Sequence, residues 1–283
     1  MKILSLSVVV PTRSCVNDCG PCVSKMHATA RDYPCMSPNL SDGRTEAEYR
    51  KRLEFARDNG CNTALLTGSG EPQQNWDFIG WITNLNERLD KPFRWMEIQT
   101  TGVMMDEKHV GYLEDRGIDT VALSLFSFDD DENMNCRGSK LPVSIEKFCG
   151  WVKGAGMNLR LSLNMNHRFA VKPELLFTAC RNLGADQVTL RRLYVSDEGS
   201  PQAEWIRKND CDLLNVNAYV ASHPIIRRLE TGPVIHDVMG MGVISDQDCM
   251  ARDLRDENDL RYLILRPNGK LYSSWDTKAS LVF

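Results

Sequence analysis

Short apolar runs rich in β-branched residues alternate with longer amphipathic segments from the N-terminus to about residue 193. The short runs predict strands at Leu4–Val10, Thr63–Thr67, Met96–Thr100, Thr120–Phe126, Leu159–Met165 and Gln187–Leu193. The amphipathic segments predict helices at Thr45–Asn59, Trp76–Leu89, Glu107–Asp115, Ile145–Lys153 and Pro173–Asn182. Such alternation is typical of an α/β fold in which right-handed crossovers connect parallel strands. We therefore expect an open or partial barrel with its site at the carboxyl ends of the strands.

The pattern changes in the last third of the chain. Asp210–Ser222 predicts another helix, and the Gly- and Met-rich segment Gly232–Asp248 predicts a loop. Arg261–Arg266 and Lys270–Trp275 flank an Asn-Gly pair, which is typical of a β-hairpin turn. We expect residues 1–205 to form the barrel and residues 206–283 to form an extension of helix, loop and hairpin that caps it.

Composition and charge narrow the class of protein. The chain has 283 residues, of which 42% are hydrophobic and 25% charged, as in ordinary globular proteins. A net charge of −4 gives no strong signal for nucleic-acid binding. No apolar run is long enough to span a bilayer, so no membrane partner is expected. The apolar run after Lys2 lacks a cleavage site, and it predicts a first strand in a cytoplasmic protein.

Ten cysteines are many for such a chain, and three of them form a cluster. Without a secretion signal, metal binding, catalysis or burial is favoured over disulfides. Cys15, Cys19 and Cys22 directly follow the first strand, and three thiolates at this spacing can converge on one face of an iron–sulfur cubane. One iron would then stay open to another ligand, as chemistry at a metal requires. A zinc site with His27 as fourth ligand and a chance spacing are the alternatives.

The motif Cys15-x3-Cys19-x2-Cys22 after a first strand resembles the signature of the radical S-adenosylmethionine (SAM) superfamily, over about residues 4–195. The resemblance implies a partial (β/α)6 TIM-like barrel, here with a short C-terminal β-hairpin extension. It implies a [4Fe–4S] cluster whose open iron binds SAM. It also implies an enzyme that cleaves SAM reductively to a 5′-deoxyadenosyl radical, which abstracts a substrate hydrogen atom. Pro21 departs from the family, which usually has an aromatic residue there.

Motifs at later strand ends extend the resemblance. The segment 67–72 is similar to the Gly-Gly-Glu-Pro motif of the family, and Ser124 resembles its ribose-contacting position, with Ser127 as a nearby alternative. Alternation in the fifth strand places Ser162 and Asn164 on one face, and one of the two arginines at positions 191 and 192 must point inward. The residues that we expect around SAM are Gly70, Glu71, Ser124, Ser162, Asn164 and Arg191. Structural hydrogen bonding is the alternative role for each polar residue, and Arg191 is also a candidate ligand for an anionic substrate.

The other cysteines and the length of the chain bear on the number of clusters and on the class of substrate. Three cysteines lie in apolar contexts, where we expect buried side chains that pack in the core: Cys61, Cys149 and Cys180. The others outside the motif are scattered singly, at Cys35, Cys136, Cys211 and Cys249, so we expect one cluster. The short chain favours a small, anionic or nucleotide-like substrate. A peptide or protein substrate, including the glycyl-radical activase reaction, is the alternative within this chemistry. A flavodoxin or ferredoxin is the expected electron donor, and a non-catalytic zinc or iron–sulfur protein is the alternative from another class.

Overall fold

A single 11-stranded sheet organises the chain, with strands in the order β11-β10-β1-β2-β3-β4-β5-β6-β9-β8-β7. The computed structural model describes residues 2–26, 42–195, 197–229, 234–246, 259–275 and 277–283. The strands are β1 (Lys2–Val9), β2 (Thr63–Thr67), β3 (Trp95–Thr100), β4 (Thr120–Leu125), β5 (Asn158–Asn164), β6 (Gln187–Arg191), β7 (Ile225–Arg228), β8 (Val234–Val238), β9 (Met241–Asp246), β10 (Asp259–Leu265) and β11 (Leu271–Tyr272). His27, Cys35 and Cys249 lie outside the described residues.

Helices connect the parallel strands. They are α1 (Val23–Met26), α2 (Gly43–Asp58), α3 (Trp76–Glu87), α4 (Glu107–Asp115), α5 (Asp130–Cys136), α6 (Ile145–Gly154), α7 (Pro173–Asn182), α8 (Pro201–Asn209) and α9 (Leu214–Ala221), with short 3-10 turns η2 (Pro72–Gln74), η3 (His167–Phe169) and η4 (Lys278–Ser280). Helix α2 contacts α3, α4 contacts α6, and α7 contacts α9, so the crossover helices form a layer over the sheet. Within the described residues, no helix combines the length and apolar character needed to cross a bilayer.

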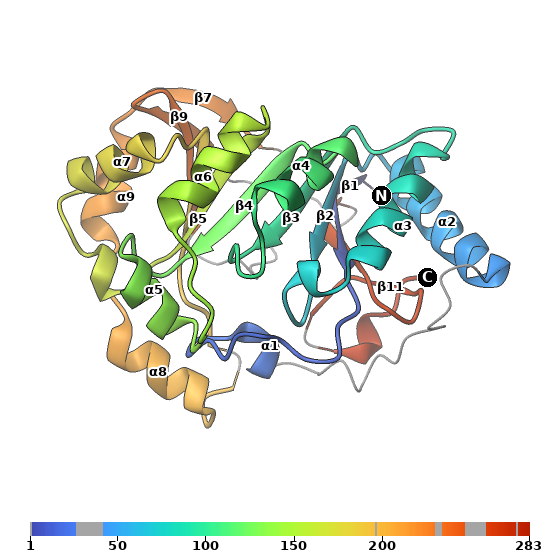
Figure 1. Cartoon of the computed structure of the whole chain (residues 1–283), viewed down its shortest axis with the longest axis horizontal. Coiled ribbons are helices and arrows are strands. Elements are labelled where there is room, and N and C mark those ends of the chain that lie inside the picture. The colour runs from blue at the N-terminus through green and yellow to red at the C-terminus, as the bar shows by residue number, and fades with distance from the viewer. Residues whose placement is uncertain (1, 27–41, 196, 230–233, 247–258, 276) are drawn as a thin grey trace.

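The parallel part of the sheet confirms the expected fold class. Strands β1 to β6 pair in chain order and in parallel, as the six apolar runs predict. Strand β9 continues the parallel array beside β6, and β10 continues it beside β1. Strands β7 and β11 form the two edges of the sheet and are drawn on opposite sides in Figure 1, and the sheet does not close in the part of the chain that is described. The fold is therefore a partial barrel.

Alternation along the strands separates an apolar face from a polar one. On β5, Leu159, Leu161 and Leu163 are fully buried in the main core under the helices. Ser162 and Asn164 point to the opposite, concave face, because successive side chains of a strand point to opposite sides. The concave face of β3–β6, called the lumen below, is therefore lined by polar side chains.

The segment Gly232–Asp248 corrects the expectation of a loop. Its described residues form β8 and β9, an antiparallel hairpin. The turn residues Met239 and Gly240 have φ of 56° and 84°, which matches a two-residue hairpin turn with both residues left-handed. The glycines and methionines of this segment are typical of a loop, whereas the β-branched residues on both sides of the turn favour strands.

The remainder of the C-terminal third agrees in part with the expectations. The hairpin of β10 and β11 is confirmed, while α9 occupies only the second part of the expected helix Asp210–Ser222. Tyr272 packs with Val9 and Ile264 in a small second core on the concave side of β1. Buried residues of both chain segments share the main core, and the domain boundary at residue 205 stays a prediction.

Candidate active site

The three cysteines lie on one loop, residues 11–22, which leaves the carboxyl end of β1 and runs across the end of β2. Gly70 makes this approach possible, because a Cβ there would lie 2.7 Å from the Thr12 hydroxyl and 3.2 Å from the Cys15 Cα. Glycine permits such close packing of backbone on backbone. Position 70, predicted beside SAM, therefore requires glycine for a structural reason as well, because a side chain there would prevent the cysteine loop from packing against the sheet.

Glu71 is the centre of a buried hydrogen-bond network. Its Oε1 accepts from Asn17 Nδ2 at 2.9 Å and from the Thr101 hydroxyl at 2.8 Å. Its Oε2 accepts from the Thr100 hydroxyl at 3.0 Å, Thr101 N at 3.1 Å and Gln73 Nε2 at 2.9 Å. A carboxylate offers about four lone-pair sites, so five donors occupy all of them. The side chain of Glu71, predicted beside SAM, thus joins the cysteine loop to the end of β3.

Gln74 adds a second tie between the cysteine loop and the β2 end. Its Oε1 accepts from Val16 N at 3.1 Å, and its Nε2 donates to Ser14 O at 3.0 Å. The same Oε1 accepts from the Glu71 backbone N at 3.2 Å. The loop conformation around Cys15 is therefore specified by side chains that follow β2.

Helix α5 holds the other half of the cysteine loop. Asp18 N donates to Arg137 O at 2.8 Å, and Gly20 N donates to Cys136 O at 3.2 Å. These bonds bracket Cys19 and satisfy carbonyls at the helix end that have no partner within the helix. Gly138 follows with φ of 56° and packs so closely on Asp18 that its Cβ position lies 2.5 Å from the Asp18 carbonyl oxygen.

Helix α8 covers the same half of the loop, and α1 and α8 are drawn at the same end of the molecule in Figure 1. The Trp205 indole lies against Gly20, where a Cβ would meet ring atoms at 2.4 Å. The same indole meets the Phe126 ring edge to face, with centroids 6.4 Å apart. Trp205 therefore connects the cysteine loop to the end of β4.

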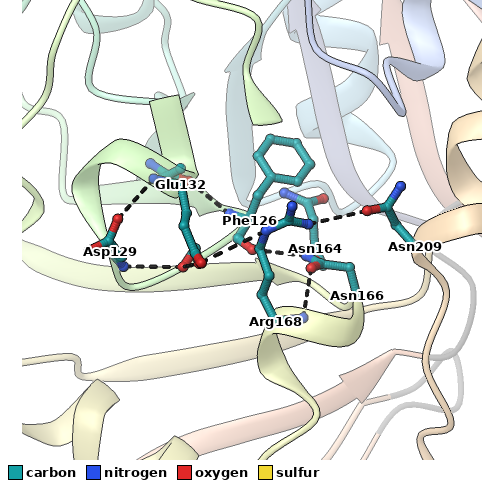
Figure 2. A network of polar contacts seen from close by, with 9 residues as sticks. Phe126, Asp129, Glu132, Asn164, Asn166, Arg168 and Asn209 are labelled. Carbon is teal, nitrogen blue, oxygen red and sulfur yellow. Dashed lines mark hydrogen bonds and ion pairs between the residues drawn. The ribbon is translucent and has the colours of Figure 1, made fainter. Parts of the chain in front are cut away.

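A polar network at the strand ends supports α5 and α8, and Figure 2 shows its bonds. Asn166 is fully buried and donates to Phe126 O at 2.9 Å and to Asn164 O at 2.7 Å. Arg168 donates to Asn209 Oδ1 on α8 at 3.2 Å, and its Nε lies 3.9 Å from Glu132 on α5. The ends of β4 and β5 are thus joined to both helices that contact the cysteine loop.

The three thiols lie near one another in a partly buried setting. Burial raises the pKa of the Cys19 thiol, and the nearby Cys22, Glu71 and Cys15 raise it further. Burial also raises the pKa of Cys15. Among the described residues, no three His, Cys, Asp or Glu side chains gather closely enough to share one metal ion. A cubane is larger than a single ion and takes thiolates that are farther apart.

The lumen brings four of the predicted site residues together. A row of hydroxyl side chains crosses β4, β5 and β6, formed by Ser124, Ser162 and Thr189. Two residues further toward the carboxyl ends, Asn164 on β5 lies in register with Arg191 on β6. Asn164 already donates to Leu125 O at 3.2 Å, whereas the buried Ser162 hydroxyl has no hydrogen-bond partner among the described residues.

Positive and negative side chains are not balanced in the described part of the lumen. Arg160 on β5 forms an ion pair with Glu97 on β3, and Gln99 also donates to that carboxylate, at 3.1 Å. Burial lowers the pKa of Arg160, the charge of Glu97 raises it and the charge of Arg191 lowers it, which places Arg191 on the same face. Arg192 is exposed and points to the other face, where it lines a cavity beside the start of α9. Arg191 is therefore the inward arginine of the pair.

Sequence patterns did not predict the contacts of Asn17, Gln74, Arg137 and Trp205 with the cysteine loop and its supports. Signals for the two overlooked helices are present: Asp129 precedes three acidic residues as the N-cap of α5, and Ser200 precedes a proline as the N-cap of α8. No local signal marks Asn17 or Gln74, because their partners are distant in the sequence. The predicted packing of Cys61, Cys149 and Cys180 is confirmed, since all three are fully buried.

Known proteins resemble this chain at the level of family and fold. The Radical SAM superfamily model matches residues 9–165, more than half of the chain. No curated protein sequence matches the chain significantly. SuiB of Streptococcus suis, solved with its precursor peptide SuiA, superimposes with a TM-score of 0.63 and 16% identity, over 96% of this chain and 59% of that one.

Two other solved structures superimpose on parts of the chain. They are anSMEcpe with bound AdoMet and the Cp18Cys peptide (TM-score 0.52, 18% identity, 68% of this chain and 51% of that one) and HydG, a maturase of the [FeFe]-hydrogenase (TM-score 0.53, 14% identity, 78% and 49%). The chain thus spans about half to three fifths of the length of these structures. At such identities the likeness shows a shared fold, and the family match supplies the assignment. The chain belongs to the radical SAM superfamily, whose members are enzymes that use a [4Fe–4S] cluster and SAM.

Proposed function

We propose that this enzyme cleaves SAM reductively at a cluster held by Cys15, Cys19 and Cys22 and removes a hydrogen atom from a small anionic substrate in the lumen. The residues fit the cluster, because three thiols occupy one loop that β2, β3, α5 and α8 all hold in place. When bound, the cluster and SAM supply the one-electron chemistry, and the protein supplies placement and exclusion of water. A flavodoxin or ferredoxin as electron donor and a cytoplasmic location remain parts of this proposal.

The charge of the lumen carries the proposal of an anionic substrate. Glu97 neutralises Arg160 at the lower level of the lumen. Arg191, at the carboxyl end of β6, forms no ion pair with a described side chain, and its buried Nε has no hydrogen-bond acceptor among the described residues. A buried charged donor without a partner is costly, so an anionic ligand at this point would be favourable. Ser124, Ser162 and Asn164 are proposed to contact SAM or the substrate beside it.

A peptide substrate is the second candidate. SuiB superimposes over 96% of this chain and was solved with its precursor peptide, and anSMEcpe was solved with a bound peptide. An acidic side chain or a terminal carboxylate of a peptide would satisfy Arg191 as well as a small acid would. Small acids and acidic peptides should therefore be tested as substrates in the same experiment.

Anaerobic reconstitution tests the first half of the proposal. The wild-type protein should bind about four irons per chain, as a single [4Fe–4S] cluster requires, and release 5′-deoxyadenosine from SAM after reduction with dithionite. Cys19→Ala should lose both properties. Cys211→Ala, which removes a half-buried thiol outside the cysteine loop, should keep them. A wild-type protein that binds one zinc and releases no 5′-deoxyadenosine would refute the proposal.

Arg191→Gln tests the substrate class. Amino acids, nucleoside monophosphates and short acidic peptides serve as probes, and a true substrate is one that becomes modified while 5′-deoxyadenosine forms. Loss of a charge-assisted hydrogen bond of about 1.5–3 kcal/mol should raise KM roughly tenfold to a hundredfold. Arg192→Gln, at the next residue and outside the lumen, is the matched control and should leave KM unchanged. If Arg191→Gln weakens SAM binding instead, Arg191 contacts SAM and the anionic-substrate argument fails.

A further inference from the structure

Arg137 occupies an unusual position next to the cysteine loop. Its backbone carbonyl accepts the hydrogen bond of Asp18 N at 2.8 Å, immediately before Cys19. The neighbouring Cys136 carbonyl accepts from Gly20 N, immediately after Cys19. The backbone of Arg137 is therefore fixed beside the central cysteine of the motif by bonds on both sides.

The side chain of Arg137 is completely buried and poorly paired. Its exposed fraction is 0%, and it heads the fully buried side chains of the described chain by volume. Nη2 donates to Leu141 O at 3.3 Å, but Nε and Nη1 have no hydrogen-bond partner among the described residues. Burial lowers the pKa of Arg137, but a guanidinium stays protonated in proteins and so does not escape this cost by losing its proton. A buried cation of this kind requires a nearby negative charge.

Among the described residues, no carboxylate bonds directly to that cation. Asp130 contributes a favourable charge, but its Oδ1 accepts from Ile145 N at 2.9 Å. Glu71 contributes a favourable charge, but its two oxygens already accept from five donors. Cys19 lies near enough to contribute a negative charge as a thiolate ligand of the cluster. Metal binding deprotonates such thiols. Three thiolates around a [4Fe–4S] core carry a net negative charge, and reduction of the core adds one more negative charge.

We propose that Arg137 is the buried counter-charge of the cluster, a positioning residue that stabilises the cluster-loaded protein and favours the reduced form of the cluster. This inference rests on the proposed function only in requiring that Cys15, Cys19 and Cys22 hold a cluster. Charge near an iron–sulfur cluster is one of the factors that set its reduction potential. A unit charge about 10 Å away, at an effective dielectric of about 20, changes a one-electron equilibrium roughly tenfold.

A redox titration monitored by electron paramagnetic resonance tests the inference on the reconstituted protein. Arg137→Met removes the charge and keeps much of the volume, and it should disfavour reduction about tenfold, a shift of roughly 59 mV to more negative potential. Arg137→Lys keeps the charge and should stay near the wild-type potential. Arg52→Met is the matched control, because Arg52 is also largely buried but pairs with Glu48 on α2, away from the cysteine loop. An unchanged potential in Arg137→Met overturns the proposal.

Thermal unfolding provides a second measurement that needs no activity. The gain in Tm on cluster loading should be smaller in Arg137→Met than in the wild type, because only the loaded protein benefits from the cation. In a Cys19→Ala background, which cannot hold the cluster, Arg137→Met should be neutral or stabilising. Equal losses of Tm in loaded and metal-free protein would mean that Arg137 has a packing role, and the inference would fail. Failure of the wild-type protein to load a cluster would instead refute the proposed function.

Discussion

Glu71→Gln distinguishes two roles for the glutamate of the second strand end. The family motif predicts that Glu71 lies beside SAM, whereas the structure gives its carboxylate five protein donors from Asn17, Gln73, Thr100 and Thr101. The substitution changes one oxygen into an NH2 group and leaves the shape of the side chain the same. It therefore removes acceptor capacity at one site without creating a cavity.

The expected cost follows from this hydrogen-bond count. The amide oxygen can take the place of Oε2 and keep three donors, but the NH2 group then faces Asn17 Nδ2, another donor, at the former position of Oε1. A hydrogen bond to a charged group contributes about 1.5–3 kcal/mol, and one between neutral groups about 1 kcal/mol. One lost bond and several weakened bonds give a destabilisation of about 3 kcal/mol. For a chain of this size that lowers Tm by roughly 6–12 °C.

Urea and thermal unfolding of the metal-free protein measure this cost, and iron content after reconstitution measures its effect on the cysteine loop. We expect lower stability and fewer irons per chain, because Asn17 lies between Cys15 and Cys19 and loses its anchor. Glu114→Gln, at an exposed position on α4, is the control and should change neither quantity. A Glu71→Gln protein with normal stability and iron content but weaker SAM binding would refute the positioning role and restore the direct contact.

Two further predictions concern packing at the cysteine loop and in the core. Gly20→Ala places a Cβ 2.4 Å from the Trp205 ring. It should lower the free energy of unfolding by about 1–3 kcal/mol and reduce the iron content. Trp205→Leu in the same protein should recover part of the loss, and Gly111→Ala, where nothing lies within 4 Å of the new Cβ, should change neither quantity. Burial raises the pKa of Cys149 and Cys180 to about 12. Both should therefore stay protonated and resist iodoacetamide at pH 8 until the protein is unfolded, and equal labelling of native and unfolded protein would contradict their burial.

Local sequence was sufficient for the parallel strands and for the cluster motif. The apolar runs of β1 to β6 predicted their strands to within about two residues, because alternation and β-branched composition are properties of the strand itself. The spacing of Cys15, Cys19 and Cys22 likewise identified the ligand loop, since three ligands within eight residues need no distant partner. Short elements were harder: α5 has few apolar residues, and the hairpin of β8 and β9 is interrupted by glycines and methionines that predict a loop.

The tertiary structure decided what supports that loop. The donors of Glu71 come from three separate parts of the chain, and the bonds that bracket Cys19 join residues more than a hundred positions apart. The sequence determined that this protein has a cysteine loop at the end of a parallel strand. Only the folded chain shows that Glu71 is engaged by the protein, that Arg191 and not Arg192 faces the lumen, and that Arg137 is buried beside Cys19, because burial and pairing depend on which distant segments the sheet brings together.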